Sequence, residues 1–192
     1  MTTTWQTERR DRILLAAREA LEEHEYESIQ MRDVAQRAGV ALGTLYRCFS
    51  SKEHLYAAVL AEWAAGTVAV APDAHGTPEA RFRARIHQVI AAYERRPQFY
   101  RAHVTLQSSA DPNAHALLTE FGRTARASLA TEVAVLGAVS ADDAATMLWA
   151  LITSRLSHAI YRGGSVDEIH RLADEFVDLL LPRLREEQVD EA

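Results

Sequence analysis

Helical periodicity along almost the whole chain is the sequence feature that most restricts its fold. Apolar residues first recur at three- and four-residue spacing between Ile13 and Leu21, which predicts an amphipathic helix over 8–23. Residues 67–71 are the only candidate strand, and they are too few and too isolated to build a sheet. Prolines stand where three later helical patterns begin, a position at which the missing amide hydrogen costs little. The chain is therefore predicted to be all-α, with about nine helices.

Glycines, serines and prolines divide this pattern into segments. Gly39 ends a short helix, since glycine reaches the left-handed conformation that a helix C-terminus favours. A very short helix follows, and either Ser50 or Ser51 can cap the next one, with Ser50 and Glu53 at capping-box spacing. The predicted segments are a helix-turn-helix head over 8–50, a connecting helix over 51–66, a linker over 67–77 and a larger helical domain over 78–187.

Composition sets limits on the class of protein. The chain has 192 residues, 48% of them apolar, enough for one substantial core or for a small domain fused to a larger one. Cys48 is the single cysteine, so no intramolecular disulfide can form and a Cys-rich zinc site is excluded. No apolar run suits a secretory leader or a membrane span. We expect a cytoplasmic protein with no membrane contact and no cofactor.

The charge distribution leaves a nucleic-acid partner open. The net charge of -6 argues against phosphate binding, which Lys and Arg drive by displacing counterions. The acidic residues of the first segment gather over 22–27, however, away from its basic ones. A locally positive face is therefore predicted on an acidic protein. The basic residues concerned are Arg9, Arg10, Arg12, Arg32, Arg37, Arg47 and Lys52.

Residues 31–49 match a helix-turn-helix, in which one helix supports a second in the DNA major groove. The second helix carries small residues that allow close backbone approach, at Ala41, Gly43 and Thr44. A tight helical corner in an all-α core would produce the same composition, and composition alone leaves both interpretations open. The other candidate contacts are Leu42, Tyr46 and Lys52.

The order of residues over 38–55 favours the first interpretation. The stretch AGVALGTLYRCFSSKEHL resembles the signature of the TetR family of transcriptional regulators, with Gly-Thr-Leu-Tyr, Phe and Ser-Lys-Glu at the family's spacing. The resemblance implies a dimer that binds an inverted-repeat operator, most simply as a repressor released by a small effector. The implied DNA-binding residues are Arg32, Ala41, Leu42, Gly43, Thr44, Tyr46 and Lys52.

The sequence departs from the family pattern at three positions. Gln30 replaces the Thr or Ser that often begins the first helix of the motif, Ala41 replaces the Ser that often begins the second, and Cys48 replaces a Tyr or His. Each change removes a potential phosphate contact, and Gln30 can restore one. An activator, or a protein-binding member without DNA affinity, therefore stays an alternative.

A narrower resemblance concerns the effector. Residues 30–41, His54, Leu55 and the pairs at 96–97 and 110–111 are similar to actinobacterial repressors of cholesterol catabolism. That resemblance implies a lipophilic effector, either a sterol-derived or a fatty acyl-CoA thioester.

Aromatic and apolar residues of the larger domain are candidates for the effector site. Ordinary core packing explains each of them as well, and the polar stripe of Tyr100, His103 and Gln107 fits a solvated surface equally. The candidates are Trp63, Phe82, Ile86, Tyr93, Phe99, Tyr100, His103, Leu106, Phe121, Trp149 and Thr153.

Two strongly apolar helices near the C-terminus, over 147–160 and 169–180, suggest a homodimer interface made with their symmetry mates. An enzyme is the main alternative from another class. The sequence has no phosphate-binding Gly-rich loop after a strand, no His-Glu-x-x-His and no Gly-x-Ser-x-Gly. No catalytic residue and no metal ligand is predicted.

Overall fold

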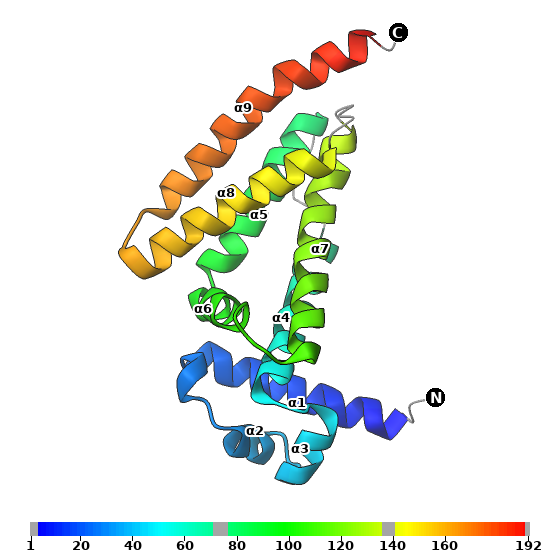
Figure 1. Cartoon of the computed structure of the whole chain (residues 1–192), viewed down its shortest axis with the longest axis vertical. Helices are drawn as coiled ribbons and strands as arrows, with labels where there is room; N and C mark the ends of the chain where they lie inside the picture. The colour runs from blue at the N-terminus through cyan, green and yellow to red at the C-terminus, as the bar shows by residue number, and fades with distance from the viewer. Residues whose placement is uncertain (1–3, 71–76, 136–140, 191–192) are drawn as a thin grey trace. The chain divides into compact units, whose positions relative to one another are not determined.

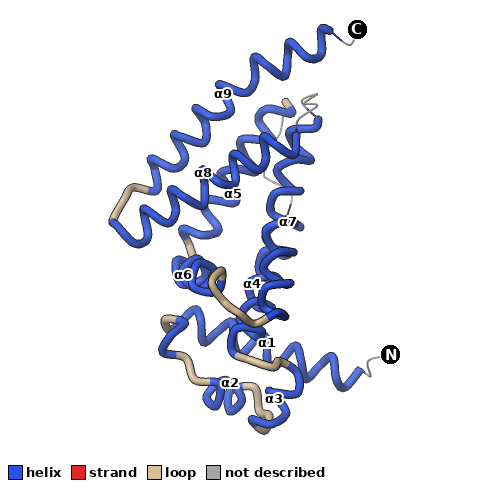
Figure 2. The backbone as a smooth tube through the Cα atoms, viewed as in Figure 1, coloured by secondary structure: helices blue, strands red, loops and turns tan. Residues whose placement is uncertain are grey.

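The computed structural model describes residues 4–70, 77–135 and 141–190. These residues form nine α-helices and one 3-10 helix and contain no strand (Figure 1, Figure 2), which confirms the all-α prediction. The elements are α1 (Thr4–Glu23), η1 (Tyr26–Ser28), α2 (Met31–Arg37), α3 (Leu42–Cys48), α4 (Lys52–Ala69), α5 (Pro78–Glu94), α6 (Pro97–Leu106), α7 (Pro112–Val135), α8 (Ala141–Arg162) and α9 (Val166–Asp190).

Helix ends follow the predicted punctuation, except that α1 begins at Thr4 instead of residue 8 and α4 runs past Gly66. Ser51 caps α4, because its Oγ accepts the His54 backbone N–H at 2.9 Å. The helix then continues to Ala69, three residues into the predicted linker over 67–77. Gly66 does not end it, since the described glycines with positive φ are Gly39 and Gly163 and the next proline comes only at Pro72. Ser140 precedes Asp142 and Asp143 in the sequence as a helix cap would, and it lies outside the described residues.

Contacts divide the chain into two compact units. Unit 1 comprises Met1–Ala64 and Arg96–Phe121, so that α6 and the start of α7 pack with the N-terminal helices. In this unit α1 contacts α2 and α6, and α6 contacts η1. Arg96 reaches Glu22 at 3.1 Å, which ties the start of α6 to the end of α1. This unit joins two segments that are separated in the sequence, and the predicted boundary at residue 78 remains a prediction.

Unit 2 comprises Ala65–Arg95 and Gly122–Ala192. Its α8 and α9 contact each other, and both contact α5. Arg83 connects α5 to α9, because it donates to Asp174 at 3.2 Å and also to Asp178. It donates as well to Glu79 of its own helix at 3.1 Å. Arg155 of α8 pairs with Glu168 of α9 at 3.0 Å.

Candidate nucleic-acid interface

The turn between α2 and α3 is held by its backbone. Gly39 has φ 64°, which only glycine adopts without strain, and its N–H bonds to Gln36 O at 3.1 Å. The Val40 N–H then bonds to Ala35 O at 3.0 Å. Leu45 is fully buried, so it anchors the inner face of α3. These contacts fix the direction of a helix of only seven residues.

The opposite face of α3 lies in solvent. Leu42 is 39% exposed and Tyr46 is 46% exposed, so an aliphatic and an aromatic side chain both reach solvent from this face. A Cβ added at Gly43 would meet no atom within 4 Å, so packing inside the protein does not demand a glycine there. Thr44 accepts a bond from Arg47 at 2.9 Å. Four adjacent predicted positions, Ala41 to Thr44, thus form one accessible surface with Tyr46.

Lys52 is less free than its sequence position suggests. Its Nζ donates to Glu27 O at 3.3 Å and lies 4.4 Å from the centre of the Tyr26 ring. Burial lowers the pKa of Lys52. The side chain therefore anchors the start of α4 to η1, and an ammonium group retains further N–H donors for a phosphate.

The basic residues around the head differ in availability. Arg37 of α2 pairs with Glu23 of α1 at 2.7 Å. The Glu23 carboxylate offsets the positive charge that Arg37 would otherwise offer to a DNA phosphate. Arg32 and Arg47 are exposed. Arg9 stacks on Trp5 at 3.7 Å, although Trp5 itself is 67% exposed. Arg47 and the Trp5–Arg9 pair were not among the predicted site residues, and their only sequence signal was the clustering of basic residues.

The candidate effector residues separate between the two units. Those of unit 1 form aromatic pairs: Trp63 lies 5.4 Å from Phe99 and His103 lies 4.6 Å from Phe121, measured between ring centres. Tyr100 and His103 are buried and Gln107 is exposed, so the solvated-surface interpretation is wrong for the first two members of the polar stripe and holds for the third. The unit 1 members are Trp63, Phe99, Tyr100, His103, Leu106 and Phe121.

The unit 2 candidates are more scattered. Phe82 and Ile86 are fully buried, and Tyr93 lies 6.5 Å from Trp149. The hydroxyl of Thr153 donates to Trp149 O of its own helix at 2.8 Å, which occupies its hydrogen. All five belong to Ala65–Arg95 or Gly122–Ala192.

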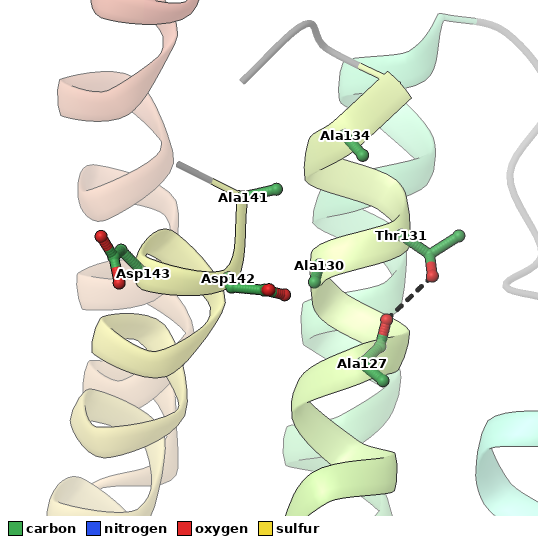
Figure 3. A pocket seen from close by; sticks show the side chains of 7 residues that line it. All are labelled: Ala127, Ala130, Thr131, Ala134, Ala141, Asp142 and Asp143. Atoms are coloured by element: carbon green, nitrogen blue, oxygen red, sulfur yellow. Dashed lines mark hydrogen bonds between the residues drawn. The ribbon is translucent and has the colours of Figure 1, made fainter. Parts of the chain in front are cut away.

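An open pocket of about 450 Å³ lies in unit 2 between α7 and the start of α8 (Figure 3). Alanines form most of its wall, and two aspartates stand at one side. None of the predicted effector residues lines it. The lining residues are Ala127, Ala130, Thr131, Ala134, Ala141, Asp142 and Asp143.

The last two helices bury one face and leave apolar residues on the other. Leu148, Ile152 and Leu156 of α8 are buried within unit 2. Met147 of α8 is 54% exposed and Leu179 of α9 is 77% exposed. The predicted dimer face therefore has uncovered apolar side chains in the single chain.

Two other classes of site find no support in the part of the chain that the structure describes. No helix there is long and apolar enough to cross a membrane. Within the same ranges, no group of three or more His, Cys, Asp or Glu side chains could hold a metal ion.

Comparison with known proteins gives a family match for the segment that contains α2 and α3. Residues 13–59 match the family model described as bacterial regulatory proteins, tetR family. The HTH-type transcriptional repressor KstR of Rhodococcus jostii (strain RHA1) is 37% identical over 119 residues, which are 62% of this chain and 56% of that protein. The chain thus matches a little over half the length of this curated relative.

Solved structures extend the likeness to the whole fold. A TetR transcriptional regulator from Rhodococcus sp. RHA1 has a TM-score of 0.78 and 26% identity, covering 92% of this chain and 97% of the other. The regulator FadR of Bacillus subtilis, solved in complex with stearoyl-CoA, has a TM-score of 0.69 and 16% identity, covering 89% and 97%. The first likeness agrees with the resemblance in the sequence, and the second shows a shared fold.

Proposed function

We propose that this chain, whose residues 13–59 belong to the tetR family of bacterial regulatory proteins, is a transcriptional repressor that binds operator DNA as a dimer and responds to a small effector. The observation that carries the proposal is the solvent-facing surface of α3. Leu42 and Tyr46 stand exposed on it, while Leu45 and the Gly39 turn hold the helix in place. The likeness to KstR favours a repressor over an activator.

In this proposal α3 enters the major groove and α2 supports it from the backbone side. Gly43 admits a close approach of the groove, since nothing in the protein occupies the space above it. Tyr46 and Leu42 contact base edges or a thymine methyl, and Arg32 and Lys52 contact phosphates. Ala41 and Thr44 complete the surface as small residues that do not obstruct it.

The second copy is proposed to cover the exposed apolar residues of α8 and α9. A two-fold interface uses the same patch on both subunits, so Met147 and Leu179 of each subunit would become buried. Two heads joined this way can read two half-sites about one DNA turn, ~34 Å, apart.

His103 is the proposed polar anchor of the effector. Among the described residues its buried Nδ1 has no hydrogen-bond partner, while its Nε2 lies 3.4 Å from the Gln107 amide nitrogen. Because an amide NH₂ only donates, Nε2 accepts and the ring hydrogen stands on Nδ1. That N–H suits a carbonyl oxygen, such as the thioester of an acyl-CoA, and Phe99 and Phe121 suit a lipophilic chain. The stearoyl-CoA complex of FadR favours this ligand class.

Fluorescence anisotropy with duplex DNA from upstream of the protein's own gene tests the proposal. We expect binding that is specific in sequence and that weakens as salt increases, since released counterions drive it. Stearoyl-CoA and sterol-derived CoA thioesters are then titrated into the complex, and one class should release the DNA. No specific binding to any upstream segment would contradict the proposal.

A further inference from the structure

A chain of hydrogen bonds joins the first turn of α7 to the segment between α3 and α4. The Asn113 side-chain amide donates to Ser50 Oγ at 3.2 Å. Ser50 Oγ lies 3.2 Å from His54 Nδ1, and the Ser50 backbone N–H donates to the same nitrogen at 3.2 Å. All three residues belong to unit 1, although Asn113 is 63 positions from Ser50 in sequence.

The donors fix the state of the histidine. A backbone N–H can only donate, so His54 Nδ1 accepts and the hydrogen of the neutral ring stands on Nε2. Ser50 Oγ accepts the Asn113 hydrogen and lies in contact with Nδ1, which the Ser50 backbone N–H already occupies as donor. Ser50 therefore connects the start of α7 with His54 of α4.

A second connection runs beside the first. Asp111 Oδ1 accepts the N–H groups of Asn113 and Ala114 at 2.8 and 3.0 Å, which caps α7. The same carboxylate is hydrogen-bonded by the Ser51 side chain, and this bond is the main cause that lowers the pKa of Asp111. Because Ser51 also caps α4, the two helix starts share one set of polar groups. We call Ser50, Ser51, His54, Asp111 and Asn113 the α4–α7 junction.

The α4–α7 junction adjoins the C-terminal end of α3, the proposed recognition helix. Phe49 ends α3, is fully buried, and bonds through its N–H to Leu45 O at 2.9 Å. Its ring meets the His54 ring edge-on, 5.3 Å between centres. Ser50, the next residue, is the one that Asn113 and His54 hold. The α4–α7 junction thus fixes the path of the chain where it leaves α3.

We propose that Asp111 and Asn113 are positioning residues for DNA recognition: through Ser50 and His54, the start of α7 sets the orientation of α3. The inference rests on the proposed function. Neither residue would touch DNA. Capping alone does not require the bond from Asn113 to Ser50, because Asp111 already satisfies the first amides of α7.

Proton binding to His54 should open the α4–α7 junction, since a protonated Nδ1 cannot accept from Ser50. Burial lowers the pKa of His54, Asp111 at the cap of α7 raises it and Arg10 on α1 lowers it. The folded contacts therefore favour the neutral ring near neutral pH, where Ser50 is held.

A mutant cycle on the Asn113–Ser50 bond tests the proposal. We expect Asn113→Ala and Ser50→Ala each to weaken binding to the upstream DNA duplex about threefold, with the double variant no weaker than the worse single one. Thr119→Ala is the matched control: Thr119 is exposed on α7 and bonds only its own helix, at His115 O, 2.9 Å away. It should bind like the wild type. Additive losses, or no loss, would contradict the proposal.

Amide hydrogen exchange gives a readout that needs no DNA. In Asn113→Ala the Ser50 amide should exchange at least about threefold faster, with little change at Leu14 in the core of unit 1. If the wild type binds no upstream DNA but Ser50 is deprotected as expected, the proposed function fails and the α4–α7 junction stands. Wild-type DNA binding with unchanged Ser50 exchange in the variant would overturn the positioning role alone.

Asp111→Asn supplies the pH readout. Asparagine also caps helices, so α7 should remain intact while the negative charge beside His54 is lost. The acidic decline of DNA affinity should then move to lower pH, because the pKa of His54 falls. His24→Gln, a change at an exposed histidine of the same unit, should leave the profile in place. An unchanged profile in Asp111→Asn would contradict the role of His54.

Discussion

His103 of α6 lies against Phe121 of α7, with 4.6 Å between the ring centres. Burial lowers the pKa of His103 to about 4. In the unfolded chain the group has an ordinary pKa near 6.5. The unfolded state therefore binds more protons between these two values, and acid must destabilise the fold through this residue.

The stability of the protein should accordingly fall as pH drops from about 6.5 to about 4, by roughly 3 kcal/mol from His103 alone. The contribution is fully retained above the unfolded pKa. His103→Phe should flatten this part of the profile, and His115→Gln, at an exposed position, should not. Urea titrations at a series of pH values measure both. Parallel profiles for His103→Phe and the wild type would contradict the assignment.

Removing the charge of Arg83 in unit 2 should lower the free energy of unfolding more than removing that of an exposed arginine. It holds Glu79, Asp174 and Asp178, and without it three carboxylates face one another. We expect Arg83→Met to lower the free energy of unfolding by about 1–2 kcal/mol. Arg171→Met is the matched control, because its pair with Glu175 is more than half exposed and should contribute at most about 0.5 kcal/mol. Equal losses in the two variants by denaturant titration would show that Arg83 is not special.

Glycine substitutions should have opposite effects at a turn and inside a helix. Gly39→Ala forces a side chain into φ 64° and should cost about 1–2 kcal/mol. Gly66 lies inside α4 with nothing near a new Cβ, so the Ala variant of Gly66 should gain up to about 1 kcal/mol. Thermal unfolding compares the two. A stabilised Gly39→Ala variant would contradict the described turn.

Gly43→Ala separates stability from recognition. Alanine favours a helix interior and has open space here, so the variant should unfold at a higher temperature than the wild type. If the DNA groove approaches the Gly43 backbone, the same methyl group should weaken binding about tenfold. Anisotropy and a melting curve on one preparation provide both values. Undiminished affinity would move the groove contact elsewhere on α3.

The dimer proposal predicts a selective effect at α9. Leu179→Glu places a charge at a site that is 77% exposed in the single chain, so the fold should survive while the dimer dissociates. Leu15→Glu is the control, because Leu15 is an exposed apolar residue of unit 1. Sedimentation equilibrium distinguishes the outcomes. A Leu179→Glu variant that dimerises as tightly as the wild type would place the interface on another surface.

Local pattern was enough to predict most of the helices, including the two short helices joined by the Gly39 turn. Apolar spacing, the Gly39 turn and the prolines act over a few residues, and the structure follows them closely. The attachment of Lys52 to Tyr26, the pairing of Arg37 with Glu23 and the link from Asn113 to Ser50 join positions distant in sequence. No periodicity encodes such contacts, because they depend on how helices pack. For the same reason the burial of His103 and the grouping of α6 with unit 1 emerge only in three dimensions.

If the exposed face of α3 reads DNA, then Tyr46→Ala should weaken specific binding without changing the fold. Tyr46 is 46% exposed and outside the core, so the variant should keep the unfolding temperature of the wild type. Its affinity for the upstream duplex, measured by anisotropy at fixed salt, should fall about tenfold, while weak binding to unrelated DNA stays the same. Wild-type affinity in this variant would contradict the account of α3 as the recognition helix.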